Sequence, residues 1–158
     1  SAKVMLLDVG LLHALLGTPA AGTFPPWPDL PALLRAQLAE QIAAQELRLL
    51  DRDTGDGPEL FHWRREGGIP TEIDFLVALQ GCVVPVELKS GATGSMKSLH
   101  QFMHDKKLDF AVRIDANPPS LMTVDVKTTQ GQPVRYRLLG IPPYLVWRLS
   151  DLAAAVTA

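Results

Sequence analysis

The chain has 158 residues, 47% of them hydrophobic and 20% charged, and these values suit a single globular domain with its own core. Its formal net charge of −2 argues against a protein that grips nucleic acid through a large basic surface, so any DNA contact must be local or assisted by a metal or partner. The chain has no bilayer-length apolar run, no signal peptide pattern and a lone cysteine, Cys82. These features predict a cytoplasmic protein with no disulfide and no membrane partner, in which Cys82 is a small buried residue.

The first part of the chain predicts one strand and two helices separated by long turns. The expected elements are a strand at 3–7, a helix from Asp8 as N-cap to Leu16, a Pro-rich loop at 18–31, a helix from Pro31 to about Leu50, and a turn cluster at 51–58. The second helix is apolar over a wide arc, which predicts packing on more than one side. Its expected wet face consists of Gln37, Gln41, Gln45 and Arg48. Glu40 and Glu46 lie away from that face.

The second part of the chain alternates strands with helices. The expected elements are a strand at 59–65, a loop at 66–70, paired strands in 71–79 and 82–91, a helix at 95–107, strands at 109–114, 121–127 and 134–139, and a helix at 149–156. The helix at 95–107 should face inward with Met96, Leu99, Phe102 and Met103. The tryptophans Trp27 and Trp147 should anchor loops in the core. This alternation predicts one mixed α/β domain over residues 1–158.

The paired strands carry the most informative residues of the chain. The break Gln80-Gly81 predicts a tight hairpin turn, and pairing of Leu79 with Cys82 then places Asp74 opposite Glu87. The same register places Glu72 opposite Lys89. Like charges directly opposite each other on neighbouring strands are destabilising, so something must offset their repulsion. A divalent cation held by carboxylate oxygens is the simplest candidate.

Side-chain alternation places Glu72, Asp74 and Leu76 on one face of the first strand, and Pro85, Glu87 and Lys89 on one face of the second. Pro85 lacks a ladder donor, which favours one-sided pairing or a bulge at that position.

The expected roles follow from charge. Asp74 and Glu87 would hold Mg²⁺ or Mn²⁺, which activates a bound water and stabilises charge on a phosphodiester. Lys89 would orient the attacking water or neutralise the transition state. Glu40, ringed by small apolar neighbours, would add a further ligand or a general base, and Glu46 is the alternative for that role.

The order Glu40, Asp74 and Glu87-Leu88-Lys89 resembles the PD-(D/E)XK nuclease superfamily, and within it the Holliday-junction-resolvase branch. The wider chain is also similar to a domain of unknown function at the C-terminus of bacterial and archaeal AAA-type ATP-binding proteins. The shared landmarks are an opening like KVMLLDVGLLHALLG, then LAEQIAAQEL, LFHWRREGG, TEIDFLVAL, VPVELKSG, SMKSLHQF and an ending like IPPYLVWRL. The proline-aspartate pair of the superfamily's name is Ile73-Asp74 here.

This resemblance implies a restriction-endonuclease-like fold, a mixed central sheet flanked by helices. It also implies that the chain is the C-terminal part of a longer protein whose N-terminal ATPase module is missing here. Whether the chain forms an oligomer is left open by the sequence. The site residues would be Asp74, Glu87, Lys89 and Glu40, with Mg²⁺ or Mn²⁺ held by the three acids and DNA as the partner. The segment at 91–98 does not match the spacing of a Walker A motif, so it offers no such route to ATP binding.

Several alternatives stay open from the residues alone. The domain would be an active or relic metal-dependent nuclease, a non-catalytic DNA- or protein-interaction module regulated by the ATPase, or a structural oligomerisation domain. Asp74, Glu87 and Lys89 could instead form a solvated sheet face with a Glu72–Lys89 ion pair. His100 and His104 have helical spacing suited to metal binding, but no third ligand is evident. The basic-aromatic cluster His62, Trp63, Arg64 and Arg65 could steer a phosphate backbone or simply pack at a strand end.

Overall fold

The structure of the chain is a computed structural model that describes residues 5–6, 8–15, 17, 29, 31–50, 60–66, 71–89 and 95–157. Its elements are α1 (Val9–Leu15), α2 (Ala32–Leu47), β1 (Phe61–Arg64), β2 (Glu72–Leu79), β3 (Cys82–Leu88), α3 (Lys97–Lys106), β4 (Phe110–Ile114), β5 (Ser120–Lys127), β6 (Pro133–Ile141), the 3-10 helix η4 (Pro143–Arg148) and α4 (Leu149–Thr157). The strand expected at 3–7, the loop at 18–31, the turn cluster at 51–58 and Trp27 fall wholly or largely outside the described residues. None of the described helices is both long and apolar enough to cross a bilayer.

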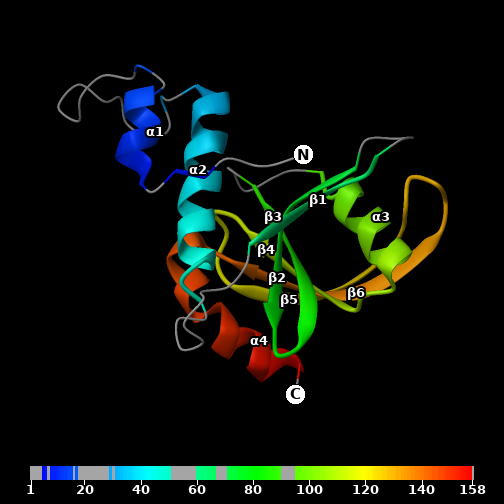
Figure 1. The fold of residues 1–158 in the computed structure, drawn as a ribbon. Coiled ribbons are helices and arrows are strands. Elements are labelled where there is room, and N and C mark those ends of the chain that lie inside the picture. Colours follow the sequence, from blue (N-terminus) through cyan, green and yellow to red (C-terminus); the bar gives the residue numbers. More distant parts are fainter. Residues whose placement is uncertain are drawn as a thin grey trace.

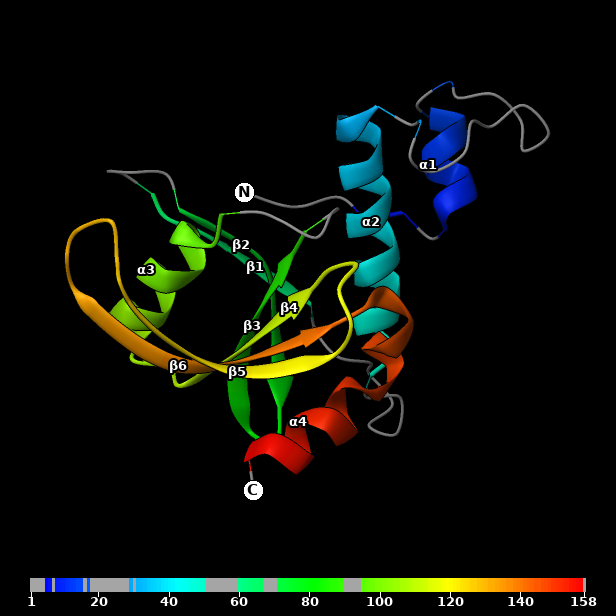
Figure 2. The same cartoon turned by 180° about the vertical axis from the view of Figure 1, so that it is seen from behind.

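The six strands form one mixed sheet in the order β1-β2-β3-β4-β6-β5. The three central strands β3, β4 and β6 run parallel, while β1, β2 and β5 pair antiparallel with their neighbours. Helices flank the sheet, with α2 and α4 toward one side and α3 toward the other (Figures 1 and 2). The predicted α/β class with a mixed sheet flanked by helices is therefore confirmed.

The β2–β3 hairpin has the predicted turn and register. Gln80 and Gly81 both have positive φ, at 52° and 77°, as a two-residue turn matched to the twist of a hairpin requires. Leu79 pairs with Cys82, and the ladder continues without a slip to Phe75 opposite Val86. Local turn chemistry is thus sufficient to fix which residues of the two strands meet.

Pro85 shows the one-sided pairing that its missing N–H predicts. It lies opposite Leu76 of β2, whereas the parallel ladder with β4 begins only at Val86. The edge of β3 that faces β4 is thus paired only from Val86 to Leu88. The strand therefore becomes a central strand only over its second half, which carries Glu87.

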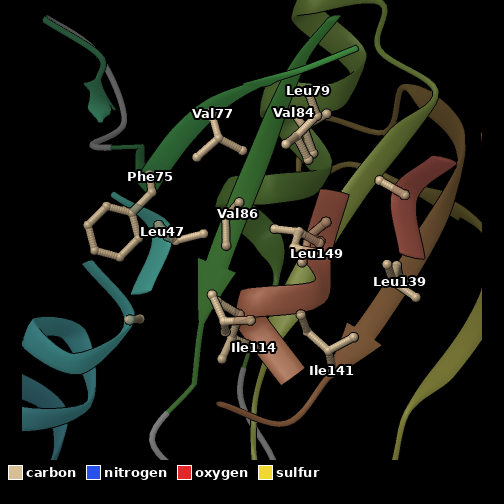
Figure 3. Packing of buried hydrophobic residues seen from close by; sticks show 14 of the residues in the cluster. Leu47, Phe75, Val77, Leu79, Val84, Val86, Ile114, Leu139, Ile141 and Leu149 are labelled. Carbon is tan, nitrogen blue, oxygen red and sulfur yellow. The ribbon is translucent and has the colours of Figure 1, made fainter. Parts of the chain in front are cut away.

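Two apolar clusters fill the two sides of the sheet. The cluster on the side of α2, η4 and α4 includes Leu47, Phe75, Val86, Ile141 and Leu149, and Figure 3 shows these side chains converging between the sheet and the helices. The cluster on the side of α3 contains, among others, Ile73, Leu99, Phe102, Met103 and Leu138. Three of the side chains predicted to face inward from the helix at 95–107, Leu99, Phe102 and Met103, are indeed buried.

The simple alternation predicted for the strand at 71–79 is wrong at one point. Ile73 belongs to the cluster under α3, whereas Phe75 and Val77 belong to the cluster under α2 and α4. The register between β1 and β2 shifts over this stretch: Phe61 lies opposite Leu76, but Trp63 lies opposite Ile73. One extra residue in β2 therefore interrupts the pleat around Asp74, and such bulges re-aim side chains.

The segment before α1 buries a side chain that the sequence predicted to be exposed. Asp8 caps α1 as predicted, because its Oδ1 accepts the Leu11 N–H at 2.9 Å. Gln41, expected on the wet face of its helix, is buried, and its side-chain amide exchanges two hydrogen bonds with the backbone of Leu6. The segment before α1 covers that part of α2, a long-range contact that helical periodicity cannot reveal. Neither described residue of the strand expected at 3–7, Met5 or Leu6, has strand structure.

Two expected core residues are instead at the surface. Cys82 is exposed at the start of β3, and Trp147 is 65% exposed in η4. In η4, Val146 supplies the buried side chain, and Leu149 at the start of α4 supplies the next.

Candidate functional site

Asp74 is tied to β3 through its carboxylate. Its Oδ2 accepts the backbone N–H of Leu88 at 2.8 Å. The ladder pairs between β2 and β3 end at Phe75–Val86, one step short of Asp74. In a longer ladder, the Leu88 N–H would donate to a backbone carbonyl of β2. Here the side chain of Asp74 accepts that hydrogen bond instead. This bond brings the carboxylate of Asp74 to the peptide unit that follows Glu87.

Glu87 and Lys89 form an ion pair within the same segment. Lys89 Nζ lies 2.6 Å from Glu87 Oε1, and Glu87 is only 6% exposed. Glu87 alternates with the buried Val86, so it lies on the face of the sheet that α3 covers. A solvated face with a Glu72–Lys89 pair does not describe this region, because Lys89 pairs with Glu87 and Glu72 lies opposite Arg64 of β1.

Arg113 and Asp115 form a second ion pair, which the sequence reading missed. Arg113 of β4 lies beside Glu87 in the parallel register, and its Nε is 2.5 Å from Oδ2 of the buried Asp115. The backbone N–H groups of Lys89 and Asp115 extend the ladders past the ends of β3 and β4, donating to Ile114 and Ile141. Both ion pairs thus stand at the carboxyl ends of parallel strands, the edge where open α/β sheets bind ligands.

His100 and Tyr136 link α3 to the same face. His100 Nδ1 lies 2.9 Å from the hydroxyl of Tyr136, a buried residue of β6. Burial raises the pKa of Tyr136, and the negative charge of Glu87 raises it further, so the hydroxyl stays protonated. Burial also lowers the pKa of His100. His104 contacts Asp105 instead, so His100 and His104 make separate contacts.

Glu40 comes from the other side of the sheet. It lies half-buried on α2, whose buried Ala43, Ala44 and Leu47 pack in the cluster on the side opposite α3. Glu46 is half-buried on the same helix. Within the ranges that the structure describes, no group of three or more His, Cys, Asp or Glu side chains is placed to hold one metal ion. The structure joins Asp74, Glu87 and Lys89 around one stretch of backbone, and the role of Glu40 stays a prediction.

This arrangement concentrates charge in a mostly buried place. Asp74, Glu87 and Asp115 supply carboxylates, and Lys89 and Arg113 supply cations. Ionised groups are costly to bury unless they are paired, and such clusters are more common at functional sites than elsewhere in a core. Carboxylates are the ligands that hard cations prefer, and cationic side chains are the groups that stabilise negative charge on a phosphate.

Comparison with known protein families identifies the family of this chain. The model of a family described as "Domain of unknown function (DUF4143)" matches residues 35–131, which include Glu40, Asp74, Glu87, Lys89 and Arg113. Domains of this family typically occur with AAA-type ATPases. No curated protein matches the chain.

Proposed function

We propose that this chain, which belongs to the DUF4143 family of domains of unknown function, is a metal-dependent nuclease-like domain of an AAA-type ATPase. Its reaction, in active or relic form, would be hydrolysis of DNA phosphodiester bonds. The observation that carries the proposal is the Asp74–Leu88 hydrogen bond beside the Glu87–Lys89 ion pair. Together they bring two acids and an amine to one end of the β2–β3 hairpin. The restriction-endonuclease-like fold that the sequence resemblance implies belongs to the same proposal.

The donor chemistry fits Mg²⁺ or Mn²⁺. Mg²⁺ is usually held by one or two carboxylates together with waters and substrate phosphates, and Asp74 and Glu87 supply that number. Glu40 would be a third ligand or a general base. When bound, the ion lowers the pKa of a coordinated water and neutralises charge on the phosphodiester.

The protein's own residues would do the positioning. The Leu88 N–H donates to Oδ2 of Asp74 and so fixes the orientation of this carboxylate before any ligand arrives. Lys89, held by Glu87 and partly exposed, can turn its ammonium toward a phosphate oxygen or an attacking water. Arg113, beside Glu87 in the next strand, adds positive charge that offsets the developing negative charge.

A second function has an observation in its favour. Glu87 is already ion-paired by Lys89, Arg113 neighbours it, and one oxygen of Asp74 accepts an amide N–H. A charge network satisfied in this way can persist without a metal ion. The same face would then serve as a non-catalytic module that binds DNA or a protein partner, under control of the ATPase.

Titration of Mg²⁺ and Mn²⁺ separates the two functions. Purified chain, alone and within the ATPase that carries it, is incubated with linear, branched and single-stranded DNA at rising metal concentration. The hydrolytic proposal predicts metal-dependent cleavage that Asp74→Ala or Lys89→Ala abolishes. Asp125→Ala and Lys127→Ala, at exposed positions of β5, serve as matched controls and should cleave normally. Absence of cleavage of all three substrates in both preparations would refute hydrolysis and favour the binding module.

A further inference from the structure

A small polar hollow lies away from the Glu87–Lys89 pair, between three segments distant in sequence. It has a volume of about 210 Å³ and is bounded by the end of β1, the first turn of α3 and the turn between β5 and β6. Both views place the β5–β6 turn beside α3 (Figures 1 and 2). Two cations, Arg65 and Lys97, and three hydroxyl side chains, Thr71, Ser98 and Thr129, contribute to its lining. These groups are the hydrogen-bond donors that recognise phosphate oxygens.

The two cations of the hollow, Lys97 and Arg65, differ in their ion pairing. Lys97 is exposed and makes no ion pair within the described ranges, so its ammonium is available to a ligand. Arg65 is anchored by an ion pair with Asp105, but a guanidinium has five N–H donors and keeps some for a second partner. The hollow therefore has one anchored and one exposed cation on its lining.

The helix end and the floor of the hollow add two further groups. α3 begins without a side-chain cap and without an acidic residue in its first turn, so its amide N–H groups favour an anion. Gln101, 4% exposed, lines the hollow, and its Nε2 donates to Asp105 and Gln132. Its Oε1 has no hydrogen-bond partner in the part of the chain that the structure describes, and it remains as an acceptor for a bound hydroxyl or water.

Aromatic and basic side chains extend the same surface along β1 and α3. The Trp63 ring packs edge-on against Phe102, with centroids 4.9 Å apart. Arg65 and Lys106 lie 6.0 Å and 5.9 Å from the centre of the Trp63 ring. Strand-end packing and a basic surface therefore coexist here. Cations interleaved with an aromatic ring are typical of surfaces that follow a nucleic-acid backbone.

We propose that this hollow binds a phosphate group of a nucleic-acid strand and so anchors the strand beside the Asp74–Glu87 site. The inference rests on the proposed function for the identity of the strand, but the binding itself needs no metal. Thr71 precedes Asp74 by three residues, about 10 Å of extended strand. In a duplex, one strand carries a phosphate about every 3.4 Å along the helix axis, so this length spans no more than a few nucleotides. A phosphate in the hollow would therefore position a phosphodiester a few nucleotides away at the hairpin end.

The test measures binding without metal. Fluorescence anisotropy of a labelled single-stranded oligonucleotide is recorded in EDTA, at salt concentrations from low to physiological. Lys97→Gln removes the exposed cation, and Lys127→Gln on β5 is the matched control. Losing one phosphate contact should reduce the slope of log K against log salt by about 0.7 for a single strand. We expect that reduction in Lys97→Gln and none in Lys127→Gln.

Arg65→Gln removes the second cation of the hollow and is measured in the same binding assay. Circular dichroism of each variant checks that it is folded. Equal binding by Lys97→Gln and the wild type, or equal weakening by Lys127→Gln, would overturn the proposal. Competition by millimolar inorganic phosphate without any oligonucleotide binding would also overturn it, since the site would then serve a small phosphate ligand. Binding that depends on Lys97 but is never followed by metal-dependent cleavage would support the anchor and count against hydrolysis alone.

Discussion

The two faces of the sheet are made by the same strands but differ in chemistry. Toward α2, η4 and α4, a large apolar cluster fills the space, with Phe75, Val86 and Ile141 among its members. Toward α3, apolar residues share the space with Glu87, Arg113 and Tyr136. Among the described residues, the α3 face carries the buried ion pairs, whereas Glu40 and Glu46 on the α2 side are only half-buried.

This difference separates stability from function. Apolar burial contributes about 25 cal/mol per Å² and needs no partner, so the cluster toward α2 stabilises the sheet directly. Charged groups under a helix are often neutral or unfavourable for stability compared with apolar groups of similar shape. The two ion pairs on the α3 face therefore indicate that this face is polar for a reason other than stability.

Removing a large side chain from the apolar face should have the greatest effect on stability. Phe75 is 1% exposed, and Phe75→Ala should lower the free energy of unfolding by about 3–5 kcal/mol through lost burial and a residual cavity. Phe61, in the neighbouring strand, is 55% exposed, and Phe61→Ala should change it by less than about 0.5 kcal/mol. Urea unfolding of both variants measures the contrast. Equal losses would show that the cluster under α2 does not hold the sheet.

Breaking the ion pair on the polar face should cost less. Lys89→Met leaves Glu87 buried without its ammonium partner, which we expect to lower the free energy of unfolding by about 1–3 kcal/mol. The cost is below that of a fully buried pair because the side chain of Lys89 is 21% exposed. Adding Glu87→Gln to Lys89→Met should recover part of the loss. A double variant less stable than Lys89→Met would contradict the view that these charges are retained against stability.

Removing one hydroxyl from the polar face should have a smaller effect. Tyr136→Phe deletes the hydrogen bond to His100 and should lower the free energy of unfolding by about 1 kcal/mol. Tyr144→Phe is the matched control, because Tyr144 is 70% exposed and its hydroxyl is available to water. Urea unfolding of both variants and the wild type compares their free energies of unfolding. If both behave like the wild type, the His100–Tyr136 bond adds nothing to the packing of α3.

The sequence predicted the local contacts of this chain and missed the long-range ones. Local rules were sufficient for the hairpin register, the Asp8 cap and the inward face of α3, because each depends on neighbours in sequence. The shift at Asp74 depends on pairing with β1, and the burial of Gln41 depends on Leu6, which lies 35 residues away. No local pattern encodes either contact.

Arg113 did leave a signal in the sequence. It alternates with Val112 and Ile114 in a strand flanked by apolar residues, and a charged residue inside such a strand predicts a buried, paired group. Tyr136 left none, because tyrosine is ordinary in strands. Only the tertiary structure shows that it meets His100 and the charge of Glu87.

The smallest expected effect is a pH dependence that belongs to the polar face alone. Burial lowers the pKa of His100 below its usual 6.5, so the folded protein binds its proton less readily than the unfolded chain. The stability contributed by neutral His100 is therefore complete above pH 6.5 and declines as the pH falls below it. His100→Gln cannot take up that proton, so its free energy of unfolding should decline less than that of the wild type between pH 7 and pH 5.

His104→Gln, on the same helix but in contact with Asp105, controls for a general effect of losing an imidazole. Chemical unfolding at half-unit steps across this range compares the three proteins. Parallel curves for wild type and His100→Gln would mean that His100 is solvated like an ordinary surface histidine. The hydrogen bond between His100 and Tyr136 would then not shield His100 from water. The face under α3 would not be a closed polar site. A flatter curve for His100→Gln alone would instead identify His100, held against Tyr136, as a proton-sensitive group of the face under α3.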